Sequence, residues 1–417
     1  MKPHKLLTAT AVVSASALVL SACGNAGPGG GGDGEFTEDK IVIGVLNDQS
    51  GVYKDLSGPN SVTAVEMAVA DYQEEHGDDA VVDEIEVITA DHQNKPDVAN
   101  TQAGQMYDRD NADIILDVPT SSAALAVATQ AAEKEKLYFN IGAATTELTN
   151  EQCNKYTFHY AYDTYQLANA TGTAVTENGG TNWEIIYPDY AFGQDMDKSF
   201  TAAVEAAGGS VGQHIATPFP NDNFTTFLTK AASSNPDVIG TMQAGGDLIN
   251  LVKQYNEGGY ADQDIELAVG LMFITDIHSL GVEAFNGVNF TDAWYWNFDD
   301  ENRAWADRFM EETGTRPSFA HAANYSAARQ YLEAVQAEGT DDADTIVEHL
   351  EGKEVDDIFL RDGKFRAEDH RVIHDVYLAK VKSADEVEED WDYQEILTTI
   401  PAADAFMPVE DTTCSMG

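Results

Sequence analysis

The sequence predicts an α/β fold of two Rossmann-like lobes, each built around a central parallel sheet. Apolar, β-branched segments of strand length alternate with longer segments of helical period, which is the pattern of βαβ units. The alternation runs to about residue 142 and starts again after residue 165. A chain of 417 residues also exceeds what one hydrophobic core normally serves, so two lobes are expected.

The first lobe opens with "IVIGVL", an apolar run of strand length. Its expected strands are 41–46, 84–90, 112–118 and 136–142. The segments between these strands carry the helical period, over 58–75, 96–109 and up to about residue 134. This order of strand and helix predicts a parallel sheet.

The pattern of the second lobe follows the segment "TFHYAYDTY" (157–165). Its expected strands are 183–187, 210–217, 237–242 and 265–271, and its expected helices are 166–178, 192–207, 223–234 and 246–257. The two lobes are expected to share the helical segments 301–313, 320–337 and 343–350 and a tail of alternating strands that includes "RVIHDVYLAKV" (371–381).

The N-terminus has the order of a bacterial lipoprotein signal. A basic start is followed by an apolar stretch over 6–20 and by "LSAC", which ends at Cys23. The apolar stretch is interrupted by Thr and Ser and is too short for a comfortable membrane span. We therefore expect residues 1–22 to be removed and Cys23 to carry lipid, with an ordinary cleaved secretion signal as the alternative.

A Gly-rich tether over 23–39 follows the signal and has no apolar residues to bury in a core. The folded part is expected to begin near Lys40, on the outer face of the cytoplasmic membrane. In such an extracytoplasmic compartment the two remaining cysteines, Cys153 and Cys414, can form one disulfide. Two separate buried thiols are the alternative.

Charge is the strongest compositional signal. The chain has 72 Asp and Glu against 23 Lys and Arg, a formal net charge of −49. Nucleic acid and anionic lipid are therefore poor partners, because the chain would repel them. Scarce lysine together with abundant acid predicts a protein adapted to high salt, in which screening relieves the self-repulsion.

No catalytic or metal-binding pattern keeps its structural context. The hydrolase-like "GGSVG" places Ser210 in a loop between an expected helix and an expected strand, the reverse of what a nucleophile elbow needs. His370 and His374 have the spacing of metal ligands on a helix, but they lie in an alternating strand, where solvated side chains are expected. We expect neither enzyme activity nor a metal nor a cofactor.

Ligands of open parallel sheets gather at the carboxyl ends of the strands. The loop after the first strand holds Ser50 and Tyr53, and the loop after the third holds Thr120, Ser121 and Ser122. Hydroxyls at a helix start can cap the helix or can donate to a bound carboxylate. The loop after the fourth strand, "IGAATTELT", repeats the small residues and hydroxyls, which favours a carboxylate site.

These motifs resemble a known family. "KIVIGVLNDQSGVYKDLSG", "PTSSAALA", "IGAATTELT", "YPDYAFGQD" and "GTRPSFAHAANYSAARQYLEAVQAEGT" stand in the order found in extracytoplasmic solute-binding proteins of ABC transporters. The resemblance is to the branched-chain amino acid (Leu/Ile/Val-binding) type with the periplasmic-binding protein type I fold. It implies two lobes joined by a three-stranded hinge that close on a small solute and deliver it to ABC permease subunits.

The resemblance also implies lobe boundaries. The first lobe would comprise 40–161 plus 297–352, and the second would comprise 162–296 plus 353–417. The three crossings between them would lie near 162–165, 293–297 and 351–357. A monomer anchored through Cys23 is expected.

Site residues follow from the same resemblance. Ser121, together with Ala143 and Thr145, would hold the carboxylate of the ligand, with Thr120 and Ser122 beside them. An aromatic side chain from "DYAFG", Tyr190 or Phe192, would cover the ligand. An ammonium group would need an acid from the second lobe, for which Asp247 and Asp276 are the candidates.

Aromatic residues in or near the expected cleft predict a ligand with a flat or apolar body, if several of them face the cleft rather than the lobe cores. These residues are Tyr53, Tyr162, Tyr190, Phe192, Phe273, Trp294 and Trp296. The ligand would thus be a branched-chain or aromatic amino acid, or an aromatic or other organic acid.

Two other functions remain as alternatives. A ligand-binding sensory protein of the same fold would need a transmembrane segment or a signalling domain, and the sequence has neither pattern. A secreted hydrolase would need a histidine beside the hydroxyls at the strand ends. His92 and His278 are the nearest candidates, and a hydrogen bond from Ser121 to either would favour the enzyme.

Overall fold

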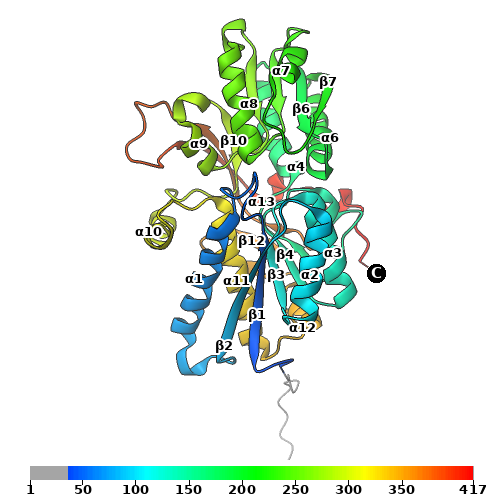
Figure 1. Ribbon diagram of the computed structural model, residues 1–417, viewed down its shortest axis with the longest axis vertical. Helices are drawn as coiled ribbons and strands as arrows, with labels where there is room; N and C mark the ends of the chain where they lie inside the picture. Colours follow the sequence, from blue (N-terminus) through cyan, green and yellow to red (C-terminus); the bar gives the residue numbers. More distant parts are fainter. Residues whose placement is uncertain (1–35, 417) are drawn as a thin grey trace, which may run out of the picture. The chain divides into compact units, whose positions relative to one another are not determined.

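The computed structural model describes residues 36–416, and its first parallel sheet has the strand order β2–β1–β3–β4–β5 (Figure 1). All four pairings in this sheet are parallel. The strands are β1 (Lys40–Asn47), β2 (Glu84–Asp91), β3 (Ile114–Asp117), β4 (Leu137–Asn140) and β5 (Thr157–His159). The predicted α/β fold is confirmed.

Helices cover both faces of this sheet, and together they form the first lobe. Alternate residues of β1 point to opposite faces, so Ile43 packs with α1 and α11, whereas Leu46 packs with α2 and α3. Because both faces are buried, the strand is a continuous apolar run. The helices are α1 (Gly58–His76), α2 (Pro96–Asp108), α3 (Ser121–Lys134), α10 (Asp300–Thr313), α11 (Phe319–Glu338) and α12 (Ala343–Leu350).

The second parallel sheet has the order β7–β6–β8–β9 and forms the core of the second lobe (Figure 1). Its strands are β6 (Asn182–Pro188), β7 (Ser210–Thr217), β8 (Val238–Thr241) and β9 (Glu266–Val269). Its longer helices are α6 (Ala191–Ala206), α7 (Thr225–Ala232), α8 (Gly245–Gly258) and α9 (Ile274–Leu280). Ser210 begins β7 and does not lie in a loop. The residues directly after it form a strand and not the helix that a nucleophile elbow needs.

The helix expected over 166–178 is interrupted. It consists of α4 (Thr164–Leu167), a π-helical turn η3 (Ala168–Gly172) and α5 (Thr173–Glu177). Short 3₁₀ turns complete the helical segments: η1 (Gly77–Asp79), η2 (Thr146–Thr149), η4 (Ala261–Gln263), η5 (Val282–Phe285) and η6 (Val409–Asp411).

Two small antiparallel sheets lie where the chain passes between the lobes. One pairs β10 (Asn289–Asp292), β14 (Val376–Val381) and β15 (Gln394–Ile400), and α13 (Ala402–Ala405) follows it. The other pairs β11 (Glu354–Val355), β12 (Gly363–Phe365) and β13 (Val372–Ile373). This second small sheet is joined to β5 of the first parallel sheet by a bridge between His159 and Arg371. The chain therefore remains next to the first parallel sheet beyond residue 353.

The segment "RVIHDVYLAKV" is two strands, β13 and β14, rather than one. The break falls at His374 and Asp375, where the chain passes from one small sheet to the other. The expectation that His370 and His374 are solvated is wrong, because both are buried. His370 stacks on Phe158 with ring centroids 4.1 Å apart, and His374 Nε2 lies 2.6 Å from the carbonyl oxygen of Ala161. Burial lowers the pKa of His374 to about 4, so this residue is neutral.

Cys153 and Cys414 form a disulfide, which settles the alternative that the sequence left open. The bond joins residues 261 positions apart. A loop of that length belongs to the upper part of the roughly 0–5 kcal/mol range that disulfides contribute. Cys23, the predicted lipid attachment site, lies outside the described residues, as do the predicted signal peptide and most of the tether.

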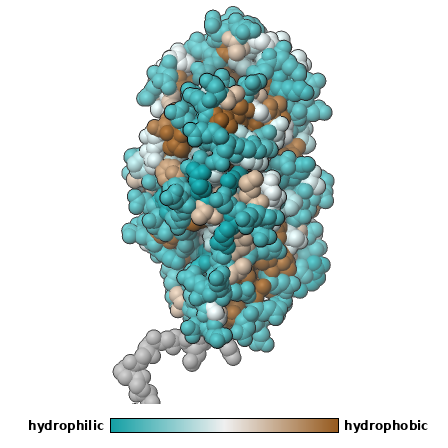
Figure 2. Space-filling view, turned by 90° about the vertical axis from the view of Figure 1, so that its left-hand side faces the viewer, coloured by the Kyte–Doolittle hydropathy of each residue, from teal (hydrophilic) through white to brown (hydrophobic). Residues whose placement is uncertain are grey.

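The face shown in Figure 2 is mainly hydrophilic, with hydrophobic residues scattered between the polar ones. This surface fits a chain with 72 acidic residues. None of the helices in residues 36–416 combines the length and the apolar character that a bilayer-spanning helix requires.

Candidate functional site

The hydroxyls after β3 stand at the start of α3. Thr120 is the residue before the helix, and the first helical hydrogen bond runs from Ala124 N to Thr120 O at 2.9 Å. Thr120 Oγ1 donates to Asn94 Oδ1, so that hydroxyl already has a partner. Ser121 is 1% exposed, and its Oγ has no hydrogen-bond partner among the described residues. Ser122 is half-buried. Of the three hydroxyls, only that of Ser121 is therefore both buried and unpaired among the described residues.

The loop after β4 lies directly against the loop after β3. A Cβ on Gly142 would come within 2.6 Å of Pro119 Cα, so only glycine allows this approach. Asn140 Nδ2 donates to Ala143 O at 2.7 Å and holds the turn. Thr145 is buried, and its Oγ1 accepts from Glu147 N at 3.4 Å at the start of η2. Ala143 and Thr145 come soon after Gly142, the residue that approaches Pro119.

A buried carboxyl group, that of Asp117, lies at the end of β3 and holds the start of the loop after this strand. Asp117 ends β3, and its Oδ2 accepts from Ser57 Oγ at 2.8 Å and from Asn47 Nδ2 at 3.0 Å. Burial raises the pKa of Asp117 to about 6, although these hydrogen bonds oppose the shift. Asp117 and Val118 have φ values of 84° and 62°, a conformation rare for a β-branched residue. Strain of this kind clusters at functional sites.

Four of the predicted aromatic residues line one small cavity between the two lobes. The cavity has a volume of only about 10 Å³, room for about one water molecule, and is lined by Tyr53, Leu56, Pro119, Tyr162, Tyr190, Phe192, Ala244 and Leu271. Ligand pockets are usually larger, roughly 300–1,000 Å³. Any ligand must therefore separate the lining side chains before it can enter.

Hydroxyls of the aromatic residues are bonded across this cavity. Tyr53 Oη and Tyr190 Oη lie 2.6 Å apart, one from each lobe. Tyr162 Oη donates to Gly142 O at 2.6 Å, which ties the aromatic lining to the β4 loop. Phe219 was not among the predicted aromatic residues, yet it packs on Tyr190 and Tyr53 with centroid distances of 4.4 and 5.5 Å.

The other aromatic candidates pack elsewhere. Phe273 stacks on Phe319 with centroids 4.5 Å apart, beside the cavity rather than in its lining. Trp294 Nε1 donates to Ile358 O at 2.7 Å, and Trp296 Nε1 donates to Trp391 O at 2.9 Å. The two tryptophans are therefore part of the packed region near the hinge.

The two acids from the second lobe differ in their surroundings. Asp276 Oδ2 accepts from Phe273 N at 2.9 Å and so caps the start of α9. Asp247 stands in the first turn of α8 and accepts from Asn221 N at 3.0 Å. Burial raises the pKa of each carboxyl to about 7. Asp247 lies three residues beyond Ala244, which lines the cavity, but Asp247 itself is not part of the lining.

Ser50 does not join this group. Its side chain is exposed, and its Oγ donates to Asp91 Oδ2 at 2.7 Å. The neighbouring Asp48 organises the same loop, because its Oδ2 accepts from Tyr53 N at 2.8 Å. The β1 loop thus presents Tyr53 to the cavity and turns Ser50 away from it.

The lobes are in direct contact around the cavity. Gly246 N donates to Val52 O at 3.0 Å, and the backbone of Gly245 at φ 54° lies so close to the same carbonyl that a Cβ would collide with it. Beside the β4 loop, Thr146 N donates to Asp195 Oδ2 at 2.7 Å, and Asp195 belongs to α6 of the second lobe. These contacts describe a closed arrangement.

The hydroxyl of Ser121 is not activated by either candidate histidine. His92 Nδ1 accepts from Asn94 N at 2.9 Å, and His278 Nδ1 lies 2.9 Å from Tyr393 Oη. Ser121 Oγ bonds to neither ring. The hydrogen bond from Ser121 to a histidine that would favour a hydrolase is therefore not formed.

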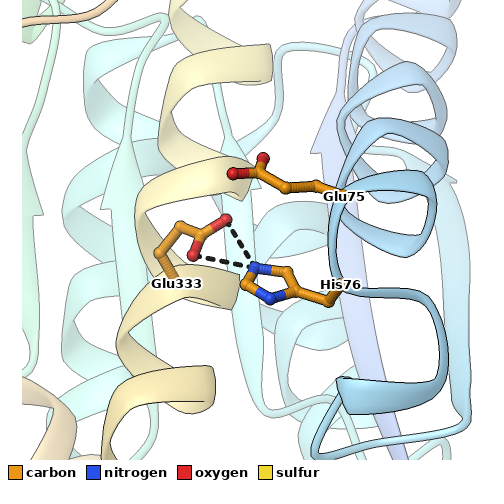
Figure 3. A group of neighbouring side chains, drawn as sticks. All are labelled: Glu75, His76 and Glu333. Atoms are coloured by element: carbon orange, nitrogen blue, oxygen red, sulfur yellow. Dashed lines mark hydrogen bonds and ion pairs between the residues drawn. The ribbon is translucent and has the colours of Figure 1, made fainter.

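One group of described acid and histidine side chains is close enough together to hold a metal ion. It comprises Glu75 and His76 at the end of α1 and Glu333 on α11 (Figure 3). His76 Nε2 lies 3.1 Å from Glu333, but Arg329 donates to both Glu75 and Glu333 and already offsets their charge. We read this group as an ion-paired contact between two helices, outside the lining of the cavity.

Comparison with known proteins gives concordant matches. Residues 40–386 match the family model described as periplasmic binding protein. A periplasmic binding protein from Burkholderia mallei is 41% identical, with a TM-score of 0.87 over 91% of this chain and 99% of that one. A branched-chain amino acid ABC transporter periplasmic ligand-binding protein from Burkholderia xenovorans is 33% identical, with a TM-score of 0.80 over 90% of this chain and 99% of that one.

A more distant structure shares the fold. The solute-binding protein of an ABC transporter from Rhodopseudomonas palustris, solved in complex with benzoate, is 20% identical, with a TM-score of 0.78. The match covers 90% of this chain and all of that one (100%).

Proposed function

The chain belongs to the periplasmic binding protein family, and from this premise we propose that it captures a small carboxylate as the solute-binding component of an ABC importer. One observation carries the proposal. Among residues 36–416, Ser121 Oγ finds no hydrogen-bond partner although it is buried at the start of a helix. Leaving a buried hydroxyl unpaired costs about 1–3 kcal/mol, so a site that keeps one is suited to a ligand that pairs with it.

The carboxylate would bind at the start of α3. Unpaired N–H groups and the positive end of the helix dipole favour an anion there. Ser121 would donate through its Oγ, and Thr145 would donate from the β4 loop that Gly142 brings alongside. Ala143 has no side chain beyond Cβ and leaves room for the anion. No lysine or arginine in the described part of the chain lines the cavity, so hydroxyl and backbone groups would recognise the carboxylate.

The body of the ligand would lie among the aromatic side chains. Tyr53 and Tyr190 would separate from one another and enclose it from the two lobes. Flat or branched apolar groups suit such a pocket. The benzoate complex of the Rhodopseudomonas palustris protein supports the view that this fold can hold an aromatic monocarboxylate.

An aromatic acid without an ammonium group fits the second lobe better than an amino acid does. The residues that follow β9, Gly270 to Phe273, are apolar apart from their backbone, and Asp276 is used as a helix cap. Asp247 remains as a possible ammonium partner, but it would need to ionise in a site where burial holds its pKa near 7. An amino acid would therefore bind with release of a proton from Asp247.

Transport would follow from closure of the lobes. A ligand that contacts both lobes favours the closed arrangement, since only that arrangement makes both sets of contacts. The closed protein would then deliver the ligand to the permease subunits. The lipid on Cys23 would keep the protein at the outer face of the cytoplasmic membrane, near those subunits.

Calorimetry in molar salt with benzoate, leucine and glucose tests the proposal. Benzoate or leucine should bind and glucose should not. Repeating the titration in buffers of different ionisation enthalpy separates the two acids, because only leucine should release a proton. Binding of glucose with no response to either acid would overturn the proposal.

A further inference from the structure

The C-terminal segment of the chain passes from the second lobe back to the first. Residues 401–414, here called the strap, leave β15 of the sheet β10–β14–β15 and end at the disulfide to Cys153. Cys153 lies between η2 and β5 of the first lobe. We propose that the strap is a further, covalently closed connection between the lobes that restrains opening of the hinge and so strengthens ligand retention. The effect on retention rests on the proposed function.

The strap is anchored at its second-lobe end before it reaches the hinge. Asn169 Nδ2, from the π-helical turn η3, donates to Asp404 O at 3.2 Å. The side chain of Ala405 packs with Val376 and Phe406 in a small buried cluster. Val376 is the first residue of β14, which follows directly after the chain passes between the two small sheets.

At its centre the strap covers a buried ion pair of the hinge. Phe406 is buried, and its ring lies 4.2 Å from the guanidinium of Arg371. Arg371 Nε donates to Asp163 Oδ2 at 2.8 Å, and Asp163 lies in the segment between β5 and α4, where the chain first leaves the first lobe. Arg371 also bridges to His159 of β5. Phe406 therefore closes over the ion pair between two of the crossings.

At its first-lobe end the strap has four separate attachments. Arg366 Nη1, between β12 and β13, donates to Met407 O at 2.6 Å. Thr412 Oγ1 donates to Thr149 O at 2.8 Å, and Thr413 N donates to Asn150 Oδ1 at 2.9 Å. The disulfide follows at Cys414.

The consequence is mechanical. Opening rotates the lobes about the crossings, so the anchors at Asp404 and at Cys414 must move relative to one another, or Phe406 must leave Arg371. With the disulfide intact, the strap cannot detach at its first-lobe end. Phe406 then stays at a high effective concentration over the hinge and returns when the lobes close. Without the disulfide, hydrogen bonds and packing alone would hold the segment.

The test compares the oxidised protein with the double variant Cys153→Ser/Cys414→Ser. Dissociation of benzoate should be faster and affinity about fivefold or more lower in the variant, the lower end of couplings between separate sites. Small-angle X-ray scattering of the ligand-free proteins should give a larger radius of gyration for the variant. Circular dichroism at the same temperature checks that both proteins are folded.

Phe406→Ala provides a second variant that keeps the disulfide, and it should change the same two quantities in the same direction. Val409→Ser, at an exposed position of the strap, is the matched control and should change neither. If benzoate does not bind at all, the proposed function fails, whereas scattering still decides the role of the strap. Folded variants with unchanged benzoate affinity, or with no binding and an unchanged radius of gyration, would overturn the inference.

Discussion

Single residues of the site differ in how far the sequence could identify them. Local pattern placed Ser121 after a strand and at the start of a helix, and the family resemblance singled it out among the three hydroxyls. Asp117 and Gly142 could not be identified in this way, because their roles depend on contacts between segments far apart in the chain. Asp117 bonds to Ser57, 60 residues away, and Gly142 allows the approach of Pro119. The partner of each residue could therefore not be predicted from the residues next to it in the sequence.

Asp247 gives a prediction for pH dependence. Burial raises its pKa from 3.8 to about 7, so the folded protein binds a proton there that the unfolded chain does not bind between about pH 4 and pH 7. Stability is therefore lost as the pH rises through this window, by at most about 1.4 kcal/mol per pH unit for this one group. Asp247→Asn should remove that contribution.

Urea denaturation at about pH 5 and about pH 8 measures the difference. The fall in free energy of unfolding between the two values should be smaller for Asp247→Asn than for the wild type. Asp262→Asn, at an exposed position of η4, is the control and should behave as the wild type does. An equal fall in all three proteins would show that Asp247 ionises normally.

At the scale of elements, the regular strands and helices followed from hydrophobic pattern because they are buried on one or two faces. Eight of the nine strands of the two parallel sheets lie in or close to the predicted segments, whereas β5 was not predicted as a strand. Elements near the hinge were less visible. β10 and β15 flank β14 in a small antiparallel sheet, and most residues of β15 are exposed or half-buried. The strand expected over 371–381 is divided because it passes between two sheets. The sequence pattern of these strands is irregular because neighbouring residues lie in different environments.

The contact between η2 and α6 gives a prediction about closure. Asp195 accepts from Thr146 N at 2.7 Å and from Thr164 Oγ1 at 2.6 Å. Hydrogen bonds to a charged acceptor contribute about 1.5–3 kcal/mol each, so Asp195→Ala should weaken ligand affinity about tenfold or more. Stopped-flow kinetics should assign most of the loss to faster dissociation, because the Thr146 contact joins the closed lobes.

Asp197→Ala is the matched control for this prediction. Asp197 lies on the same helix but pairs with His214 of β7 at 2.7 Å, within the second lobe. Its loss should leave ligand dissociation unchanged. Equal effects of the two substitutions would mean that Asp195 acts on the stability of α6 rather than on closure.

At the scale of the whole molecule, two properties follow from composition and topology rather than from any one site. The closed arrangement brings the carboxyl ends of the two parallel sheets to one cavity, with the hydroxyls of Tyr53 and Tyr190 in contact across it. The net charge of −49 surrounds this arrangement with mutually repelling carboxylates. The charge follows directly from the composition, whereas the contacts between the closed lobes could be identified only from the structure.

The charge gives a prediction for salt dependence. Screening shortens the range of repulsion to about 3 Å at 1 M salt, from about 30 Å at 0.01 M. The melting temperature should therefore rise between these two concentrations of KCl, as followed by circular dichroism. A melting temperature that stays constant or falls would contradict adaptation to high salt.

Isothermal titration of Ser121→Ala with benzoate in molar salt examines the proposed contact between Ser121 and the carboxylate of the ligand. The substitution removes one hydrogen bond to a charged group, so affinity should fall about tenfold or more while the melting temperature of the ligand-free protein stays near that of the wild type. Thr129→Ala, at an exposed position two turns along α3, should bind as the wild type does. An affinity of Ser121→Ala equal to that of Thr129→Ala would show that Ser121 does not bind the carboxylate.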